Sequence, residues 1–461
     1  MPSLSPIEFA VLLPLIGLAV GIIFHAWFKS PAHLWSPLVM FSALMLYYMI
    51  IGPFLLVYNK ETVFLGVDYR EIFWKGWLAS LVAFLAFFAG YMIPKEPKRL
   101  RIATFDDPRL FYTSLVLGAF SFFCMAVWAV LSGRGLSMFN PLSSDAAYAT
   151  EMAGSVNPFI SYFLYAGNLV IPGMVVLLLF WLDSKLLPVL LVLKVVFVLA
   201  MLFFVNTGFR YRIAWTVIAL DSAYYLWRCK RPNLLLLGVG GIAFLMGMGL
   251  IGMTRNYFTG LSLERAKGAS AGDLLQNGFS EAGIFYSVCA VTDAVPERYP
   301  LTYFDPLIVT AAYPIPSMLW PEKPRSETLT IMAASFESKD AYAAGQAVPY
   351  FGEWYIAFWW PGLIGSSLLL GYAAKKLWFW YGQRMRDKLA TAIYCSCLGY
   401  LYVFFGRGYL PQTTMNFCFT VLPLFLIYHY FRKRPLPAAA RRRMRERVLS
   451  GRLFRAEKLA N

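Results

Sequence analysis

The chain has 461 residues, of which 59% are hydrophobic, 18% aromatic and only 14% charged. A typical soluble domain is nearer ~25% charged, so this chain lacks the polar surface of a water-exposed globule, and its hydrophobicity excludes a disordered protein. Lysine and arginine number 41 against 25 acids, a net charge of +16. In a soluble protein this excess would suggest nucleic-acid binding, but in a membrane protein it first has to be compared with the positive-inside rule.

Eleven segments are long and apolar enough to be membrane spans, which need about 20 mostly apolar residues. Helices are required because the backbone in lipid must satisfy its own hydrogen bonds, and the runs exceed the ~10-residue strands of an outer-membrane barrel. We therefore predict an all-α polytopic integral membrane protein, with residues 1–461 as a single transmembrane domain. The predicted spans are 7–28, 36–58, 75–94, 110–132, 158–182, 186–206, 211–227, 234–253, 354–378, 389–406 and 411–431.

The basic residues predict the orientation of the bundle. If the C-terminus is cytoplasmic, the loops on the inside carry 26 lysines and arginines and the loops on the outside carry 14. The positive-inside rule then places the N-terminus outside and the C-terminus inside. The basic tail 432–461 is explained as a segment resting on anionic lipid, without nucleic acid as a partner.

A long segment, residues 254–353, separates the eighth and ninth spans on the outer side. Its semi-apolar stretches Phe279–Val295 and Tyr303–Trp320 are typical of short interfacial or re-entrant helices. Long ordered loops are usually functional, and this one offers carboxylates for proton transfer. They are Glu281, Asp293, Asp305, Glu322 and Glu353.

Glu353 follows Phe351-Gly352 and precedes Trp354-Tyr355, at the outer mouth of the ninth span. A carboxylate among aromatic side chains is a candidate general base. An acid that stabilises a helix N-terminus is an equally good interpretation of the same position.

Four arginines lie at the outer ends of spans, where the positive-inside rule disfavours them: Arg210, Arg212, Arg255 and Arg407. Guanidinium is permanently charged and can bind phosphate through two parallel hydrogen bonds. The set would suit a diphosphate whose lipid tail remains in the bilayer. For any one of them, pairing with lipid headgroups or with acids of the long loop is an alternative.

Other polar and small residues have structural interpretations. Lys194 and Asp221, in neighbouring spans, are expected to form an ion pair, with a proton relay as the alternative. The glycines of the eighth span allow close helix contact or leave a groove for an isoprenoid chain. Metal-ligand spacing and phosphate-cradling glycine motifs are missing from the sequence, so we predict no metal and no cofactor.

Five short pieces between about residues 200 and 430 resemble the Wzy-type O-antigen polymerases, also called oligosaccharide repeat-unit polymerases. They are Gly208-Phe-Arg210, Thr254-Arg255, Pro316-Ser-Met-Leu-Trp-Pro-Glu-Lys-Pro324, Gly352-Glu353-Trp-Tyr355 with Phe358, Pro361 and Gly362, and Gly406-Arg407-Gly408. The paired Arg-x10-Gly and Arg-x15-Gly motifs of some members do not match, because Ala266 and Arg228 stand where glycine is required after Arg255 and Arg212. The roles of those loop motifs are therefore not carried over.

The resemblance implies a glycosyltransferase of the bacterial inner membrane. It would polymerise undecaprenyl-diphosphate-linked oligosaccharide repeat units into O-antigen or exopolysaccharide at the periplasmic face. Membrane lipids and a polysaccharide chain-length regulator are the other implied partners.

Within this reading the four outer arginines hold the donor diphosphate. Glu353 is the first candidate for the general base and Asp305 the second, while Trp320 and Lys323 are expected to position the long loop. An O-antigen ligase is one alternative, which is disfavoured because no histidine occurs between Trp35 and Tyr428. A flippase or secondary transporter is another, and it would need more polar residues at mid-membrane than Lys194 and Asp221.

Overall fold

The computed structural model of the chain describes most of its length. The described residues are 6–51, 53–54, 63–65, 67–95, 107–133, 135–142, 158–256, 260–279, 283–316, 319–336, 347–385 and 387–431. The predicted basic tail and the candidate acid Glu281 lie outside these ranges.

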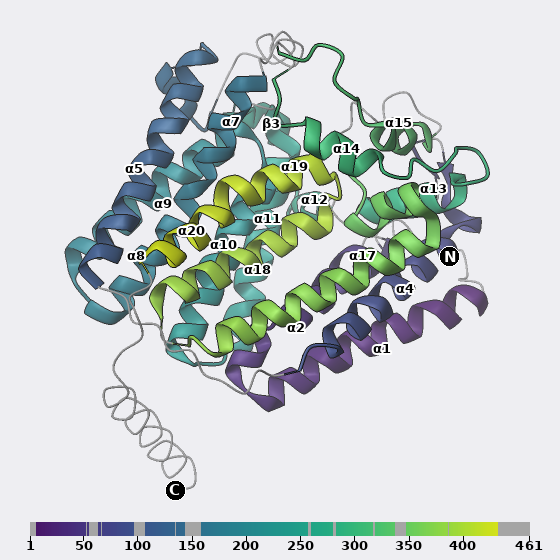
Figure 1. Cartoon of the computed structure of the whole chain (residues 1–461), viewed down its shortest axis with the longest axis horizontal. Coiled ribbons are helices and arrows are strands. Elements are labelled where there is room, and N and C mark those ends of the chain that lie inside the picture. The colour runs from purple at the N-terminus through teal and green to yellow at the C-terminus, as the bar shows by residue number, and fades with distance from the viewer. Residues whose placement is uncertain are drawn as a thin grey trace, which may run out of the picture.

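Long helices running side by side make up the body of the molecule (Figure 1). Among the described residues, nine helices are long and apolar enough to cross a membrane, judged by length and composition alone. The predicted all-α polytopic fold is therefore confirmed. Seven are α1 (Pro6–Lys29), α4 (Phe73–Met92), α5 (Asp107–Leu131), α9 (Leu187–Thr207), α11 (Leu234–Thr254), α17 (Tyr350–Gly382) and α18 (Lys388–Gly406).

The other two long helices are each built from consecutive pieces. One runs from α7 (Pro158–Ala166) through the 3-10 turn η5 (Gly167–Leu169) into α8 (Val170–Ser184), and the other from α19 (Leu410–Asn416) through the π-helical turn η8 (Phe417–Val421) into α20 (Leu422–Phe431).

Shorter or more polar helices occupy the two remaining predicted spans. The predicted span 36–58 contains α2 (Pro37–Leu46), which continues into the π-helical turn η2 (Tyr47–Ile51). The predicted span 211–227 is α10 (Arg210–Arg228), whose composition is too polar for a lipid-facing helix. Its first half lies inside the bundle, where Trp215, Thr216 and Ala219 are completely buried, whereas Asp221 and Tyr224 in its second half are exposed.

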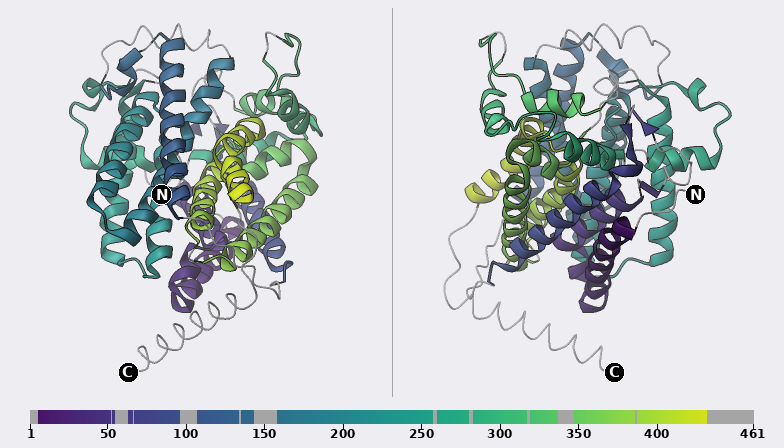
Figure 2. Two further views of the ribbon diagram at one scale, coloured as in Figure 1. Left: turned by 60° about the vertical axis from the view of Figure 1, so that its left-hand side comes forward. Right: turned by 90° about the vertical axis from the view of Figure 1, so that its right-hand side faces the viewer.

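Short elements connect α11 to α17 and gather at one end of the bundle (Figure 2). The strands β3 (Arg255–Asn256) and β4 (Gly260–Leu261) pair antiparallel there. They are followed by η6 (Leu263–Ala266), α12 (Ala271–Gly278), α13 (Ile284–Ala294), α14 (Asp305–Ala312) and α15 (Glu327–Ala334). The remaining short elements are η1 (Pro31–Trp35), the antiparallel pair β1 (Val63–Phe64) and β2 (Val67–Asp68), η3 (Tyr69–Glu71) and η4 (Gly135–Phe139).

The helices of the long connecting segment differ in burial. Phe285 and Cys289 of α13 are completely buried against Gly76 of α4, where no larger residue would fit. By contrast, Leu307 and Ile308 of α14 are exposed, as expected of a helix lying at a membrane interface. The segment is therefore partly inserted into the bundle and partly laid over its end.

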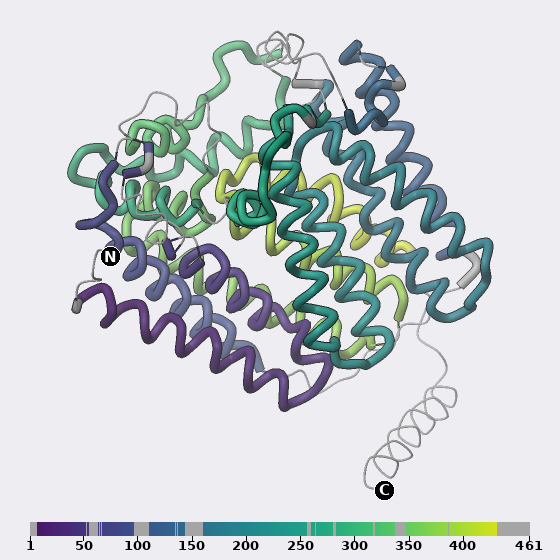
Figure 3. The backbone as a smooth tube through the Cα atoms, turned by 180° about the vertical axis from the view of Figure 1, so that it is seen from behind, coloured from purple at the N-terminus to yellow at the C-terminus, as the bar shows by residue number. Residues whose placement is uncertain are grey.

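The core is built around aromatic side chains and close helix contacts. Phe41 of α2 stacks on Phe87 of α4 with ring centres 3.8 Å apart. Phe405 of α18 packs edge-on against the ring of Phe41. Gly90 and Gly371 let the backbones of α4 and α17 touch, as small residues do in membrane helix pairs. Seen from behind, α1 lies on the outside of the bundle against α2 and α4 (Figure 3).

The helix α17 is broken at Phe358 and Trp359, just before Pro361. Proline has no N–H to donate to the carbonyl four residues earlier, which here belongs to Ala357. That carbonyl instead accepts a hydrogen bond from the backbone N–H of Tyr303 at 2.8 Å. The break in α17 therefore anchors the segment that leads into α14.

Candidate active site

The four arginines that the sequence singled out converge on the start of α10. Gly208 ends α9 in the left-handed conformation, with φ of 74°, which glycine adopts without strain. Only Phe209 separates it from α10, so Arg210 and Arg212 lie in the first turn of that helix. We call Arg210, Arg212, Arg255 and Arg407 the arginine cluster.

Arg212 is the most deeply buried member of the arginine cluster. Its side chain is 1% exposed, and Nε and Nη1 have no hydrogen-bond acceptor among the described residues. Its contacts are with aromatic faces, at 4.9 Å from the ring centre of Phe209 and 5.7 Å from that of Tyr211. Buried polar groups are nearly always hydrogen-bonded, so an unsatisfied buried guanidinium at a helix N-terminus is strongly suited to an anion.

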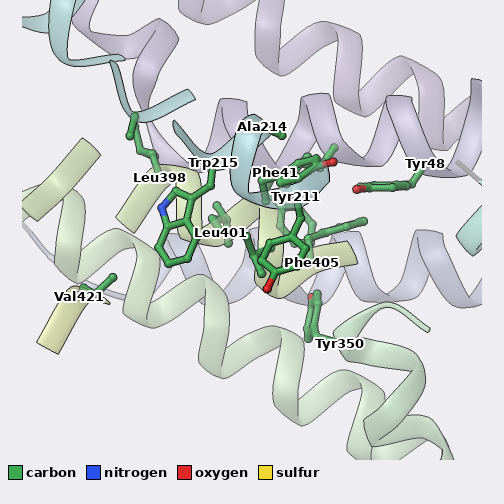
Figure 4. Packing of buried hydrophobic residues seen from close by; sticks show 14 of the residues in the cluster. Phe41, Tyr48, Tyr211, Ala214, Trp215, Tyr350, Leu398, Leu401, Phe405 and Val421 are labelled. Atoms are coloured by element: carbon green, nitrogen blue, oxygen red, sulfur yellow. The ribbon is translucent and has the colours of Figure 1, made fainter. Parts of the chain in front are cut away.

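Arg407 contacts the ring of Tyr211, as Arg212 does. It follows the last residue of α18, and its guanidinium carbon lies 4.9 Å from the ring centre of Tyr211. Tyr211 comes from α10, which packs along α18 through Trp215, Leu398 and Leu401 (Figure 4). This helix pair therefore brings together two cations that are 195 positions apart in the sequence.

The other two members contact backbone carbonyls. Nη1 of Arg210 donates to the carbonyls of Met248 and Asn277 at 3.4 Å each, so it ties α10 to α11 and α12. Its guanidinium passes over Gly252, where a Cβ atom would collide with it. Arg255 donates from Nη1 to the carbonyl of Gly208, also at 3.4 Å. Through these hydrogen bonds, Arg210 and Arg255 fix the position of the start of α10.

Glu353 is buried, at 1% exposure, and both of its oxygens accept a hydrogen bond from the backbone N–H of Leu410, at 3.0 and 2.9 Å. Leu410 is the first residue of α19, whose own N-cap residue provides no side-chain cap. Glu353 therefore caps a neighbouring helix. Since Gly408 also donates to the carbonyl of Val348 at 2.7 Å, the turn that carries Arg407 is held at two points.

Asp305 has a similar capping role for α15. Its carboxylate accepts the backbone N–H groups of Glu327 at 3.3 Å and Thr328 at 3.1 Å, and the hydroxyl of Thr328 at 2.8 Å. The alternative that the sequence raised for Glu353, stabilisation of a helix N-terminus, therefore describes both carboxylates, each acting on a helix other than its own.

Lys323 approaches the site through Tyr313. Its Nζ lies 5.7 Å from the Tyr313 ring centre and donates to the carbonyl of Ile315 at 3.1 Å. The Tyr313 hydroxyl lies 3.4 Å from that of Tyr165, which is within electrostatic range of Arg212. Trp320 is half exposed, and its backbone N–H donates to the carbonyl of Pro316 at 3.1 Å.

Sequence reasoning missed the tyrosines of the site. Tyr211 stands between Arg210 and Arg212 in the sequence, and this Arg-Tyr-Arg pattern could have indicated it. Tyr165 and Tyr313 are brought in by tertiary packing, and no local signal marks them among the 28 tyrosines of the chain.

Lys194 and Asp221 do not form the expected ion pair. Both side chains are exposed on the bundle surface, and neither has a salt-bridge partner among the described residues. In the part of the chain that the structure describes, no three His, Cys, Asp or Glu side chains are grouped closely enough to hold a metal ion.

Comparison with known families decides what kind of protein this is. The model of the family O-antigen polysaccharide polymerase Wzy matches residues 9–435. The chain belongs to this family. It is thus a multi-pass membrane protein of the polymerising glycosyltransferase type, acting on lipid-linked O-antigen repeat units.

Neither the curated proteins nor the solved structures contain a match to this Wzy-family chain. The family model's match to residues 9–435 confirms the resemblance that was inferred from five short pieces. It extends over nearly the whole length, including the spans before residue 200.

Proposed function

We propose that this Wzy-family protein joins undecaprenyl-diphosphate-linked repeat units at the periplasmic face of the bacterial inner membrane, with the arginine cluster holding the donor diphosphate. The N-terminus would be periplasmic and the C-terminus cytoplasmic, as the distribution of basic residues predicts. A chain-length regulator as partner stays a prediction.

The observation that carries this proposal is the state of Arg212. A buried guanidinium with two unsatisfied N–H groups is energetically unfavourable, since each such group loses its hydration without replacement. A diphosphate carries several acceptor oxygens, so different oxygens of one ligand would accept from the two donors. Arg407, which also contacts the ring of Tyr211, supplies a second cation for a group that carries two phosphates.

The proposed reaction is a glycosyl transfer from one lipid diphosphate to a second lipid-linked unit. The nonreducing hydroxyl of the incoming unit attacks the anomeric carbon of the growing chain. The bond between that carbon and the diphosphate oxygen breaks, and the hydroxyl proton passes to a base. The bonding electrons leave with the undecaprenyl diphosphate, where the arginines stabilise the developing charge.

Glu353 and Asp305 stay the candidates for the base, with Glu353 first. Their capping bonds give each a positioning role as well. Glu353 fixes the turn that presents Arg407, and Asp305 fixes α15 beside α14. The two roles are separable by substitution, because glutamine keeps an acceptor oxygen but is not a base.

A reconstituted polymerisation assay tests the proposal. The full-length protein in lipid nanodiscs would be given purified lipid-linked repeat units, and products would be resolved by gel. We expect a ladder from the wild type and single units from the Arg212→Gln/Arg407→Gln variant. Arg228→Gln, at the exposed far end of α10, is the matched control and should give the wild-type ladder. A full ladder from the double variant would contradict the diphosphate assignment.

A further inference from the structure

A second cationic site lies at the opposite end of the bundle from the arginine cluster. There α1, η1, α2, α4 and α17 line a half-open cavity of about 460 Å³. Lys375, which lines it, follows Glu353 along α17 by a distance of about 30 Å at the helical rise of 1.5 Å per residue. None of the residues assigned to the diphosphate site lines this cavity.

The mouth of the cavity is basic. Four cationic or titratable side chains line it, His25, Lys29, His33 and Lys375, and none of its described lining residues is acidic. His33 is held in place by a 2.6 Å contact between its Nδ1 and the Ser30 hydroxyl. Burial lowers the pKa of His33, and the positive charges of Lys29, Lys375 and His25 lower it further. Nζ of Lys375 lies 4.4 Å from the ring centre of Tyr91, which also lines the cavity. The lining is therefore positively charged and suits an anion.

The inner wall of the cavity is apolar and opens along α1. Gly17 and Gly21 stand one turn apart on the same face of that helix, and a Cβ atom at either would meet nothing within 4 Å. Leu18 and Ile22 of α1 and Phe88 of α4 line the same wall. A hydrocarbon chain would fit along this face, with its charged end at the lysines.

We propose that this cavity binds the phosphate headgroup of an anionic membrane lipid, with Lys29 and Lys375 on the phosphate and one acyl chain along Gly17 and Gly21 of α1. Basic pockets between transmembrane helices are well suited to anionic lipid headgroups. Free phosphate would satisfy the charges alone, whereas the apolar wall favours a ligand that has a chain.

Native mass spectrometry of the purified full-length protein tests the proposal. The protein would be delipidated and titrated with phosphatidylglycerol or, separately, with zwitterionic phosphatidylcholine. We expect the wild type to retain phosphatidylglycerol selectively. The variant Lys29→Gln/Lys375→Gln should retain it at least about ten-fold less well, because charge-assisted hydrogen bonds are lost.

Two further variants serve as matched controls. Lys376→Gln removes an adjacent exposed lysine that contacts the Tyr372 ring and does not line the cavity, so it should retain the lipid as the wild type does. Gly21→Leu fills the apolar wall without changing any charge and should also lose the lipid. Equal retention by the wild type and the double lysine variant would overturn the proposal.

A competition arm with inorganic phosphate separates the two sources of the phosphate group. Retention of phosphatidylglycerol in millimolar phosphate supports the lipid assignment, and displacement by phosphate overturns it. The readout requires no repeat-unit substrate, so its outcome is independent of the polymerase assay.

Discussion

Two helices, α10 and α19, begin on either side of Arg407 with opposite electrostatics. The N-terminus of α19 is capped by Glu353, a carboxylate that compensates the partial positive charge of the exposed N–H groups. The N-terminus of α10 instead carries Arg210 and Arg212 in its first turn, which adds positive charge where helices favour acids. The first terminus is satisfied within the protein, and the second is the one that we propose binds an external anion.

The difference teaches that burial alone does not separate a binding residue from a structural one. Arg212 and Glu353 are equally buried, at 1% exposure each. What distinguishes them is whether their polar atoms have partners. Both oxygens of Glu353 accept the N–H of Leu410, whereas Nε and Nη1 of Arg212 have no acceptor in the part of the chain that the structure describes.

The largest expected effect follows from removing the unsatisfied cation. Arg212→Gln should lower the polymerisation rate by about 100- to 1000-fold, the usual loss when one preorganised charge-stabilising donor is removed. Arg212→Lys should recover only part of it, because lysine is a point charge and cannot bind two oxygens in the guanidinium geometry. The assay is the ladder from purified lipid-linked repeats, and wild-type rates for the glutamine variant would contradict the comparison.

Arg407 should matter somewhat less, because its side chain is only half buried. We expect Arg407→Gln to slow polymerisation about ten- to 100-fold, which corresponds to roughly 1.4–2.8 kcal/mol. Initial rates at saturating and limiting repeat-unit concentrations would separate lost binding from lost charge stabilisation. An unchanged rate under both conditions would limit the diphosphate site to α10.

Glu353 tests the capped terminus, and its two substitutions separate capping from base catalysis. If Glu353 acts mainly as a cap, Glu353→Gln should keep at least about half of the activity, because its amide oxygen still accepts the Leu410 N–H. Glu353→Ala should lose about 1 kcal/mol of stability, typical of a missing cap, and several-fold in rate as the Arg407 turn loosens. Inactive but stable Glu353→Gln protein would instead assign the base to Glu353.

Asp305 should give the smallest effect on activity. Asp305→Ala removes the acceptor for the start of α15, which should lower the free energy of unfolding by about 1–2 kcal/mol. With Glu353 as the base, polymerisation by the folded Asp305→Ala protein should change less than two-fold, and Asp305→Asn should be intermediate in stability. Thermal denaturation and the ladder assay measure the two separately, and a large rate loss in stable protein would return Asp305 to the chemistry.

The sequence predicted the membrane fold because long apolar runs in lipid allow only helices, and α1, α9 and α11 were found almost at the predicted residues. It also gave α10 to within one residue at each end, but not that the first half of this helix is enclosed by other helices, since a buried polar stretch shows no lipid-facing signal. The arginine cluster was predictable because its members stand at span ends that the positive-inside rule predicts to be outer, where that rule disfavours charge. The partners of Glu353 and Asp305 could not be predicted. Leu410 and Thr328 are distant from them in the sequence and contribute backbone N–H groups, which no side-chain pattern marks.

The most direct test of the central claim is the affinity of purified protein for polyprenyl diphosphate compared with polyprenyl monophosphate. The account predicts that the wild type prefers the diphosphate and that Arg212→Gln loses most of this preference, while Arg228→Gln keeps it. An Arg212→Gln variant that is correctly folded and still prefers the diphosphate as strongly as the wild type would contradict it.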